Sequence, residues 1–338
     1  LATASTMGRV ALPELARARY APRLATGVLA AGGTLGILIP PSVALIVYAV
    51  IVEAPVIEMF QAALVPGLLA VAGFVGVVGV LVRRRPDLAP ALDVLPAPER
   101  RAALRRLWPV LAVFLGLVAG LGAGLFTPTP AAGVGVFAVL LHGLVVRGEG
   151  RGLTLIRLGR ALREAAATAG MIAFLLFGAE VLKTFFSRAG LPAALADWAA
   201  ASGADPFAVL ALMLLVLIVL GCFLESLSMI LVVVPFFWPV LVALNGGDFV
   251  TPETAAYGLS TEELKLWFGV LALVVVELGL ITPPVGLNVF IIGALAKDVA
   301  LSTAFRGVVP FLGIELVRVA LLAAAPVLCL WLPRLLAG

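Results

Sequence analysis

The sequence GILIPPSV at residues 36–43 returns near the other end of the chain as GLITPPVG at residues 279–286. Each copy is followed about 26 residues later by a Val-Pro step, Val65-Pro66 in the first case and Val309-Pro310 in the second. Two matching blocks 243 residues apart (279 minus 36) indicate an internal repeat. We expect this repeat to set the arrangement of the helices, and the composition indicates the class of protein to which it belongs.

The composition is that of a membrane protein. Of 338 residues, 63% are hydrophobic and 12% are charged, with a mean hydropathy of +1.19, whereas soluble domains carry about a quarter charged residues. This excludes a soluble enzyme, a disordered segment and a nucleic-acid binder, so no nucleic acid is expected as a partner. Cys222 and Cys329 lie in apolar runs, which excludes a disulfide framework and a four-cysteine metal site. The single histidine, His142, argues against a histidine-based zinc site or catalytic triad.

Apolar stretches long enough to cross a bilayer, at about 20 residues per crossing, predict an all-helical polytopic fold. They span residues 24–52, 54–82, 107–146 (two crossings), 165–179, 206–224, 226–245, 266–296 and 307–332. Arginine-rich segments lie between them, and the net charge of +4 fits topology signals that face anionic lipid of the bilayer. Placing these segments in the cytoplasm makes the second Pro-Pro block run opposite to the first. The repeat is therefore expected to be inverted, as in secondary transporters with a site at the midplane.

The Pro-Pro blocks are expected to break their helices. Each pair removes two backbone donors and forces the preceding residue out of helical geometry. At membrane depth such backbone persists only where it is buried in protein or lines a wet cavity. Freed carbonyls and nearby hydroxyls suit Na⁺, and the half-helix N-termini beyond the prolines suit a carboxylate. The alternative is a plain proline kink, but two matched breaks favour a site, with the candidate residues Gly33, Thr34, Gly36, Pro40, Ser42, Thr282, Pro283, Gly286 and Asn288.

A second polar cluster, GCFLESLS at residues 221–228, interrupts an apolar run from Phe207 to Leu244. The loops on both sides of this run are expected at the same external face, which makes the run a re-entrant hairpin with its polar tip near the midplane. Glu225 is an intramembrane acid and hence a functional candidate. The alternative is a carboxylate that caps the second arm, and both roles are compatible. The candidate residues at this tip are Gly221, Glu225, Ser226 and Ser228.

Other charged residues in apolar surroundings are weaker candidates. Glu277 lies about one turn before the second break. Glu180 and Lys183 are three residues apart, as are Glu315 and Arg318. This spacing favours ion pairs on a helix surface over substrate ligands.

The repeat divides the chain into three expected parts. Residues 1–82 hold the remainder of the first repeat: the end of a first hairpin, a broken helix and the following helix. Residues 83–164 form a cytoplasmic connector with linking helices, and residues 165–338 form the second repeat, with the second hairpin, a broken helix and a C-terminal helix. The sequence starts at Leu1 without an initiator methionine or a signal-peptide pattern, and we expect an N-terminal part to be missing.

Four of these motifs resemble one known family. GGTLGILIPPS (32–42), LGCFLESLSMI (220–230), LGLITPPVGLNVF (278–290) and PVLCLWLP (326–333) resemble the large membrane subunit of tripartite ATP-independent periplasmic (TRAP) transporters. ATASTMGRVALPE (2–14) and GLFTPTPAA (124–132) are also similar to that family, so the resemblance covers essentially the whole chain. Pro130 departs from it, since the family pattern has an acidic residue after TPT.

The resemblance implies an elevator-type secondary transporter in the bacterial inner membrane, driven by a Na⁺ gradient and without enzymatic activity or a cofactor. A periplasmic solute-binding protein would deliver an organic acid, and a small four-helix membrane subunit would assist the large one. One Na⁺ would bind near Thr34, at the break spanning residues 32–40. The other would bind between Ser226 and Thr282, where the hairpin tip faces the turn at residues 282–286. The family's first hairpin tip would lie upstream of Leu1.

Three alternatives remain. A carboxylate or citrate symporter of related architecture would work without a binding protein. An intramembrane enzyme would need paired acids, a Ser/His pair or an HExxH site, and the sequence offers none of these. A purely structural subunit would not explain two costly matched breaks. The substrate stays open among C4-dicarboxylates, keto acids, sugar acids and other organic anions.

Overall fold

The computed structural model describes residues 2–90, 96–122, 125–145, 153–201 and 203–337, and all regular structure in this part of the chain is helical. The prediction of an all-helical fold is confirmed. The helices are α1 (Ala2–Arg17), α2 (Pro22–Gly32), α3 (Leu35–Leu38), α4 (Val43–Val52), α5 (Val56–Arg84), the 3-10 helix η1 (Pro86–Leu88), α6 (Ala97–Gly122), α7 (Pro128–Val145), α8 (Leu155–Arg188), α9 (Leu191–Ala201), α10 (Pro206–Gly221), α11 (Ser226–Asn245), α12 (Thr261–Gly279), α13 (Leu287–Leu295), α14 (Leu301–Ala324) and α15 (Val327–Ala337).

The contacts divide the chain into two compact units. Unit 1 comprises Leu1–Ala91 and Val181–Gly338, and unit 2 comprises Leu92–Glu180. Both Pro-Pro blocks and the polar hairpin tip belong to unit 1. The division into residues 1–82, 83–164 and 165–338 rests on the repeat and stays a prediction.

In the described part of the chain, five helices are long and apolar enough to cross a membrane, or up to seven when each of two bent helix pairs counts as one span. One of these pairs joins Pro22–Leu38 to Val43–Val52 across a bend of 44°. The expected stretch at residues 307–332 is two helices rather than one span, because Pro326 has no N–H to donate and Ala325 before it leaves the helical region. The chain is thus a multi-pass membrane protein.

Both Pro-Pro blocks interrupt their helices as predicted. The Pro40–Pro41 and Pro283–Pro284 peptide bonds are both cis. In the first block α3 ends at Leu38 and α4 begins at Val43; in the second α12 ends at Gly279 and α13 begins at Leu287. Shifted by 243 residues, α4 falls on residues 286–295, almost the range of α13, so the two repeats match in structure as well as in sequence.

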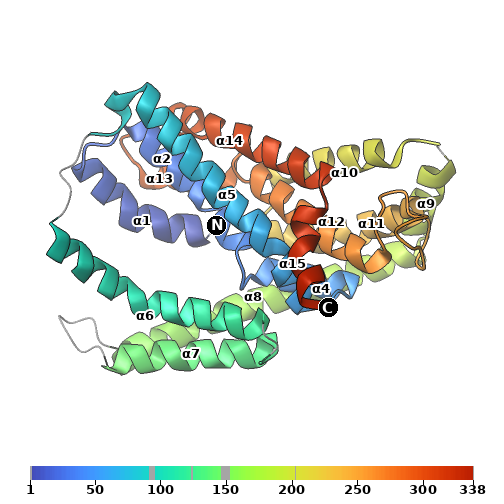
Figure 1. Ribbon diagram of the computed structural model, residues 1–338, viewed down its shortest axis with the longest axis horizontal. Helices are drawn as coiled ribbons and strands as arrows, with labels where there is room; N and C mark the ends of the chain where they lie inside the picture. The colour runs from blue at the N-terminus through green and yellow to red at the C-terminus, as the bar shows by residue number, and fades with distance from the viewer. Residues whose placement is uncertain (1, 91–95, 123–124, 146–152, 202, 338) are drawn as a thin grey trace. The chain divides into compact units, whose positions relative to one another are not determined.

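In unit 1, helices of each repeat pack on helices of the other repeat. In the first repeat α1 packs on α2, which precedes the break, and in the second α11 packs on α12. Across the repeats, α1 also packs on α13, and α11 packs on α4. The helices before each break do the same, since α2 contacts α13 and α12 contacts α4. Figure 1 shows α2, α5 and α14 running side by side over this arrangement.

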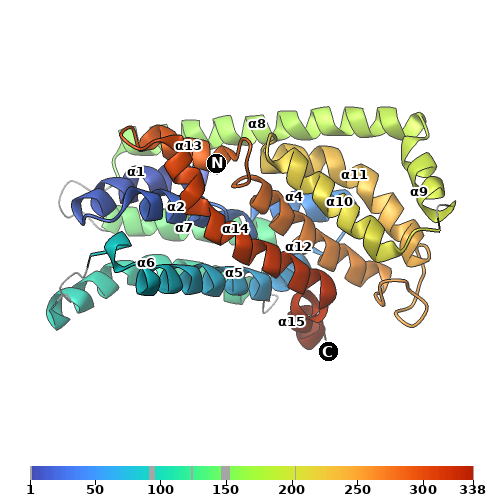
Figure 2. The same ribbon diagram turned by 90° about the horizontal axis from the view of Figure 1, so that it is seen from above.

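Helices α10 and α11 form the expected hairpin, side by side in Figure 2. Its two open ends are joined through the loop that follows α11. The Tyr257 hydroxyl donates to the carbonyl of Pro206, at the start of α10, at 2.9 Å, and the Tyr257 N–H donates to Asn245 Oδ1, at the end of α11, at 3.1 Å. Asn245 Nδ2 donates to the carbonyl of Leu259 at 2.9 Å. These bonds hold the start of α10 and the end of α11 at one end, with the polar tip at the other.

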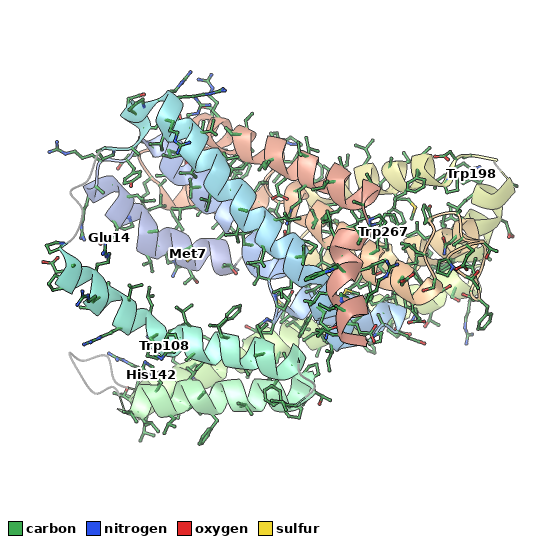
Figure 3. The ribbon with its side chains drawn as sticks, in the orientation of Figure 1. Met7, Glu14, Trp108, His142, Trp198 and Trp267 are labelled. Carbon is green, nitrogen blue, oxygen red and sulfur yellow. The ribbon has the colours of Figure 1, made fainter. Side chains whose placement is uncertain are left out.

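Helix α12 is the centre of unit 1, because its residues from Leu264 onward are almost all buried. Trp267 is fully buried and donates its Nε1–H to the carbonyl of Leu322 on α14 at 2.8 Å. Figure 3 shows Trp267 among the helices and Trp198 at the outer edge of α9; Trp198 is 62% exposed. The second break thus follows a helix that is buried over most of its length.

Unit 2 consists of α6, α7 and most of α8. Helices α6 and α7 pack on each other and carry the exposed side chains of Trp108 and His142 (Figure 3). The apolar window of α8 is not buried by any other part of the described protein. Exposed apolar helices of this length are expected where lipid or another membrane subunit covers them.

Candidate functional site

The first break contains two buried hydroxyl groups. Thr34 Oγ1 donates to the carbonyl of Ala31 at 2.8 Å, and Ser42 Oγ donates to the carbonyl of Ile37. Ser42 Oγ also accepts a long bond of 3.4 Å from the N–H of Leu45, as the N-cap of α4. Because each hydroxyl donates its proton to a carbonyl, its oxygen keeps lone pairs that can contact a cation: two on Thr34 Oγ1, and one on Ser42 Oγ, which also accepts from Leu45.

The glycines of this break permit a close approach of α1. A Cβ added to Gly33 would lie 2.6 Å from Ala4 Cβ, and one added to Gly36 would lie 2.9 Å from Thr3 Oγ1. Both spacings are too short for any larger residue. The start of α1 therefore lies directly against the first break. Pro40, the first proline of the pair, is buried at the same break.

The second break is built similarly. Thr282 Oγ1 donates to the carbonyl of Leu278 at 2.6 Å, which again leaves oxygen lone pairs for an incoming cation. Gly286 adopts φ 59°, a conformation that glycine accepts readily, and it lets the chain turn back into α13. It supplies no side chain to cap that helix. The N–H of Asn288 donates to the carbonyl of Leu280 at 3.0 Å across the turn.

The hairpin tip is closed by Glu225, which is the N-cap of α11. Its Oε2 accepts from the N–H groups of Leu227 at 3.0 Å and Ser228 at 3.4 Å. Glu225 therefore caps the second arm of the hairpin, which is one of the two roles expected for it. Glu225 is only half-buried, whereas Ser226 beside it is buried. A ligand role for Glu225 stays a prediction.

The hairpin tip and the second break lie in direct contact. A Cβ added to Gly279 would lie 2.7 Å from Gly221 Cα, so the ends of α12 and α10 touch backbone to backbone. Cys222 Sγ donates to the carbonyl of Pro283 at 3.6 Å and to that of Ile218 at 3.2 Å. The structure thus brings together two of the three predicted clusters, residues 221–228 and 282–286.

Two polar atoms beside the second break and the tip have no hydrogen-bond partner in the described part of the protein. They are Ser226 Oγ and Asn288 Oδ1, on side chains that are 2% and 0% exposed. The same Asn288 donates through Nδ2 to the carbonyl of Ala30 at 3.4 Å, and so joins α13 to α2 just before the first break. A buried polar atom without a partner costs free energy and calls for an explanation such as an unseen ion or ligand.

A buried ion cluster beside the breaks is the feature that sequence reasoning missed. Arg318 on α14 donates through Nε to Glu315 at 3.0 Å, through Nη1 to the carbonyl of Pro66 at 3.2 Å, and through Nη2 to Glu277 at 3.5 Å. The arginine and both glutamates are at most 5% exposed. The expectation of a pair on the helix surface is wrong for Glu315 and Arg318, which do pair but inside the protein, because α14 packs on α2, α5 and α12.

The position of Glu277 explains why this cluster matters for the site. It lies in the last turn of α12, and α12 also packs on α3, the short helix inside the first break. One Arg318 side chain therefore connects the helix before the second break with α5 and α14. A signal was present in the sequence: two opposite charges in the apolar stretch at residues 307–332 need a buried partner when the helix is enclosed.

Comparison with known proteins gives a consistent answer. A family model described as "Tripartite ATP-independent periplasmic transporter, DctM component" matches residues 1–328. The chain is similar to the C4-dicarboxylate TRAP transporter large permease protein DctM of Pseudomonas aeruginosa, with 31% identity over 334 residues, 98% of this chain and 73% of that protein. It is also similar to the sialic acid TRAP transporter large permease protein SiaM of Vibrio cholerae, with 31% identity over 346 residues, 100% of this chain and 74% of that protein.

A third relative is a longer protein. The isethionate TRAP transporter permease protein DctMQ of Oleidesulfovibrio alaskensis is 25% identical over 296 residues, which are 88% of this chain but 43% of that protein. The broken helices, the hairpin and the match over nearly the whole chain agree with one another. The chain therefore belongs to the DctM family, the large permease subunits of tripartite ATP-independent periplasmic transporters.

Proposed function

We propose that the protein imports a small organic anion, a carboxylate, by coupling its movement to Na⁺. Family membership supports transport, and the names of two relatives give C4-dicarboxylates and sialic acid as their substrates. Both carry carboxylate groups, so a carboxylate is the class that these two relatives share, whereas the isethionate of the third relative is a sulfonate and extends the class to organic anions. The chain is proposed to act as a transporter, with no catalytic site and no cofactor besides the coupling ion.

One observation carries the proposal for the ion: the buried Ser226 and the half-buried Thr282, whose hydroxyl oxygens have spare acceptor capacity, lie where the hairpin tip meets the second break. Ser226 Oγ has no partner, and Thr282 Oγ1 uses only its proton. Na⁺ prefers hard oxygen ligands, and the carbonyls of a broken helix supply more of them. We propose one Na⁺ between Ser226 and Thr282 and a second near Thr34 at the first break.

The N-terminal end of α13 is the proposed contact for the substrate carboxylate. It follows Gly286, which provides no capping side chain. The unpartnered Oδ1 of Asn288 in its first turn is an acceptor, so it is available to the cation rather than to the carboxylate. The N–H groups of Asn288, Val289 and Phe290 already donate to carbonyls, so the attraction proposed here is that of the helix dipole for an anion at a helix N-terminus. The half-buried carboxylate of Glu225 is itself an acceptor and caps α11, so it is not proposed as a contact for the anion.

The proposed setting is the bacterial inner membrane, with a periplasmic solute-binding protein that delivers the anion and a small membrane subunit. This chain covers 43% of the isethionate relative, which leaves room in that polypeptide for a further subunit. An elevator movement of the body that holds both breaks is proposed for transport. Uptake in vesicles with and without the cognate binding protein tests delivery, and unimpaired uptake without it would favour the binding-protein-independent symporter.

Na⁺ binding is tested without knowing the substrate. The full-length protein in detergent is unfolded thermally at matched ionic strength in NaCl, KCl and choline chloride. A ligand that binds only the folded state stabilises it by RT ln(1 + [L]/Kd), about 2.7 kcal/mol at 100 times Kd. We expect a saturable rise in Tm with Na⁺ alone. Equal Tm values in the three salts would contradict Na⁺ coupling.

Three threonine and serine variants then locate the ion. Thr282→Ala and Ser226→Ala are expected to lose most of the Na⁺-dependent rise in Tm. Thr26→Ala is the matched control, because the buried Thr26 hydroxyl donates to the carbonyl of Pro22 at 2.7 Å in the same intrahelical geometry, but well before the first break. A full Na⁺ response in Thr282→Ala and Ser226→Ala, or an equal loss in Thr26→Ala, would refute the assigned site.

A further inference from the structure

A cavity of about 280 Å³ lies in unit 1 at the end where α5 finishes and where α2 and α14 begin. Figure 1 shows these three helix ends gathered there. Arg23, Arg84 and Arg85 are among the residues that line the cavity, together with apolar residues that include Leu81 and Leu88. The wall of the cavity is thus mainly apolar with three arginines around it, and neither Pro-Pro block contributes to it.

The arginines are held in place by the fold and are not neutralised by it. Arg23 donates through Nε and Nη2 to the carbonyl of Arg306 at 3.2 and 3.1 Å, which fixes the plane of its guanidinium group. Arg84 is the last residue of α5 and Arg85 is its C-cap, and both are exposed. Among the residues that the structure describes, no carboxylate pairs with any of these three arginines.

A backbone contact anchors one wall of the cavity. The N–H of Ala21, at the start of α2, donates to the carbonyl of Leu88 in η1 at 2.9 Å. Leu88 is 9% exposed, so η1 is packed against the bundle. The turn after α5 is therefore anchored to α2, and Arg84 and Arg85 are presented to the cavity by ordered backbone.

The position of the cavity along the helices identifies its ligand. α5 and α14 are candidate membrane spans of 29 and 24 residues, and arginines at the end of a span lie at the level of the lipid headgroups. Guanidinium groups bind phosphate with two parallel hydrogen bonds. Apolar walls next to them suit the glycerol and acyl portion of a lipid, and basic pockets between membrane helices bind anionic headgroups.

We propose that this cavity binds the phosphate group of an anionic phospholipid, held by Arg23, Arg84 and Arg85. The occupant is a lipid rather than a soluble phosphate, because Leu81 and Leu88 complete the wall and the cavity lies where lipid is the neighbouring medium. The site does not depend on the proposed Na⁺ coupling or on the transported anion. It connects the end of α5 to the starts of α2 and α14, so bound lipid stabilises this junction.

Three consecutive arginines supply the test. Arg84 and Arg85 line the cavity, whereas Arg83, equally exposed and equally charged, does not. The full-length protein in detergent is titrated with dioleoylphosphatidylglycerol, and Tm is measured at each mole fraction. Dioleoylphosphatidylcholine, with the same chains but no net charge, and glycerol 3-phosphate, with the phosphate but no chains, are titrated in parallel.

We expect phosphatidylglycerol to raise Tm in a saturable way, and the other two compounds not to do so. Arg84→Gln and Arg85→Gln should each weaken the apparent affinity about tenfold, the effect of losing one hydrogen-bonded charge contact of about 1.4 kcal/mol. Arg83→Gln should bind as the parent protein does. Arg84→Lys, which keeps the charge but not the planar fork, should lie between them.

Several results would overturn the proposal. Equal stabilisation by phosphatidylcholine would mean a non-specific lipid effect, and saturable stabilisation by glycerol 3-phosphate would mean a soluble-anion site. An equal loss in Arg83→Gln would mean that only the net charge of this segment matters. Tm without added lipid controls for folding, and native mass spectrometry, which counts bound lipids directly, decides the case if a variant is less stable at the outset.

Discussion

Replacement of Arg318 by alanine is the sharpest test of the packing that surrounds the broken helices. The side chain is 5% exposed and donates to Glu315, Glu277 and the carbonyl of Pro66. Arg318→Ala would leave two carboxylates, 2% and 1% exposed, without a cation inside the protein.

The magnitude follows from the number of groups left buried and unpaired. Removal of one partner from a buried ion pair typically costs about 3–5 kcal/mol, because the remaining charge stays desolvated. The matched control is Arg334→Ala. Arg334 pairs with Glu263 at 2.7 Å, but the two side chains are 50% and 22% exposed, and exposed pairs contribute about 0–1 kcal/mol. The two substitutions remove the same side chain and differ mainly in burial.

The assay is equilibrium unfolding in mixed micelles of a mild detergent and SDS, followed by circular dichroism. The free energy of unfolding is compared among the parent protein, Arg318→Ala and Arg334→Ala. A triple replacement, Arg318→Met with Glu277→Gln and Glu315→Leu, removes all three charges and should recover much of the lost stability, since a buried ion cluster exchanged for uncharged side chains of similar volume is often near neutral.

Two outcomes would refute this reasoning. If Arg318→Ala costs no more than Arg334→Ala, the cluster is hydrated or rearranged in the membrane protein and does not hold the helices. If the triple replacement is as unstable as Arg318→Ala, the loss comes from packing volume rather than from unpaired charge.

Two further predictions concern the hairpin tip. Gly279→Ala would bring a Cβ to 2.7 Å from Gly221 Cα and should lower the free energy of unfolding by about 1–3 kcal/mol through overpacking. Gly313→Ala, in the middle of α14 with nothing within 4 Å of the added Cβ, should raise the free energy of unfolding by about 0.5–1 kcal/mol. The same SDS titration measures both variants, and equal effects would contradict the backbone contact between Gly279 and Gly221. Glu225→Ala should lower the free energy of unfolding by about 1 kcal/mol because the N-cap of α11 is lost. Glu225→Asn should keep most of that stability, because its side-chain oxygen can also accept from the first turn. An equal loss in both variants would argue against the cap.

Much of the fold follows from local chemistry in the sequence. Pro40-Pro41 and Pro283-Pro284 break helices because proline lacks an N–H and restricts the residue before it, and these effects need no tertiary information. The hairpin tip at Gly221–Ser228 was also predictable from local sequence, because polar residues interrupt an otherwise apolar run. The likeness of two such blocks then fixed the repeat.

The features that the sequence does not predict are those that depend on how helices distant in the sequence pack. The spacing of Glu315 and Arg318 predicts a pair, but whether that pair is buried depends on α5 and α12, which are far away in the sequence. Likewise, no local pattern shows that Asn288 reaches the carbonyl of Ala30. The roles of the candidate site residues in binding Na⁺ and substrate stay predictions, because they depend on ligands that bind in three dimensions.

The packing of each repeat on the other gives a physical reason why the proposed ion and substrate sites would move together. Each hairpin-side helix, α1 or α11, packs on the helix after the other repeat's break, α13 or α4, and each helix before a break also packs on the helix after the other break. Neither break can therefore shift without its counterpart unless buried contacts are lost on both sides. The hydrogen bond from Asn288 to Ala30 adds a polar link across the same boundary. A body joined in this way would carry the proposed ions and anion as one unit, as the proposed elevator movement requires.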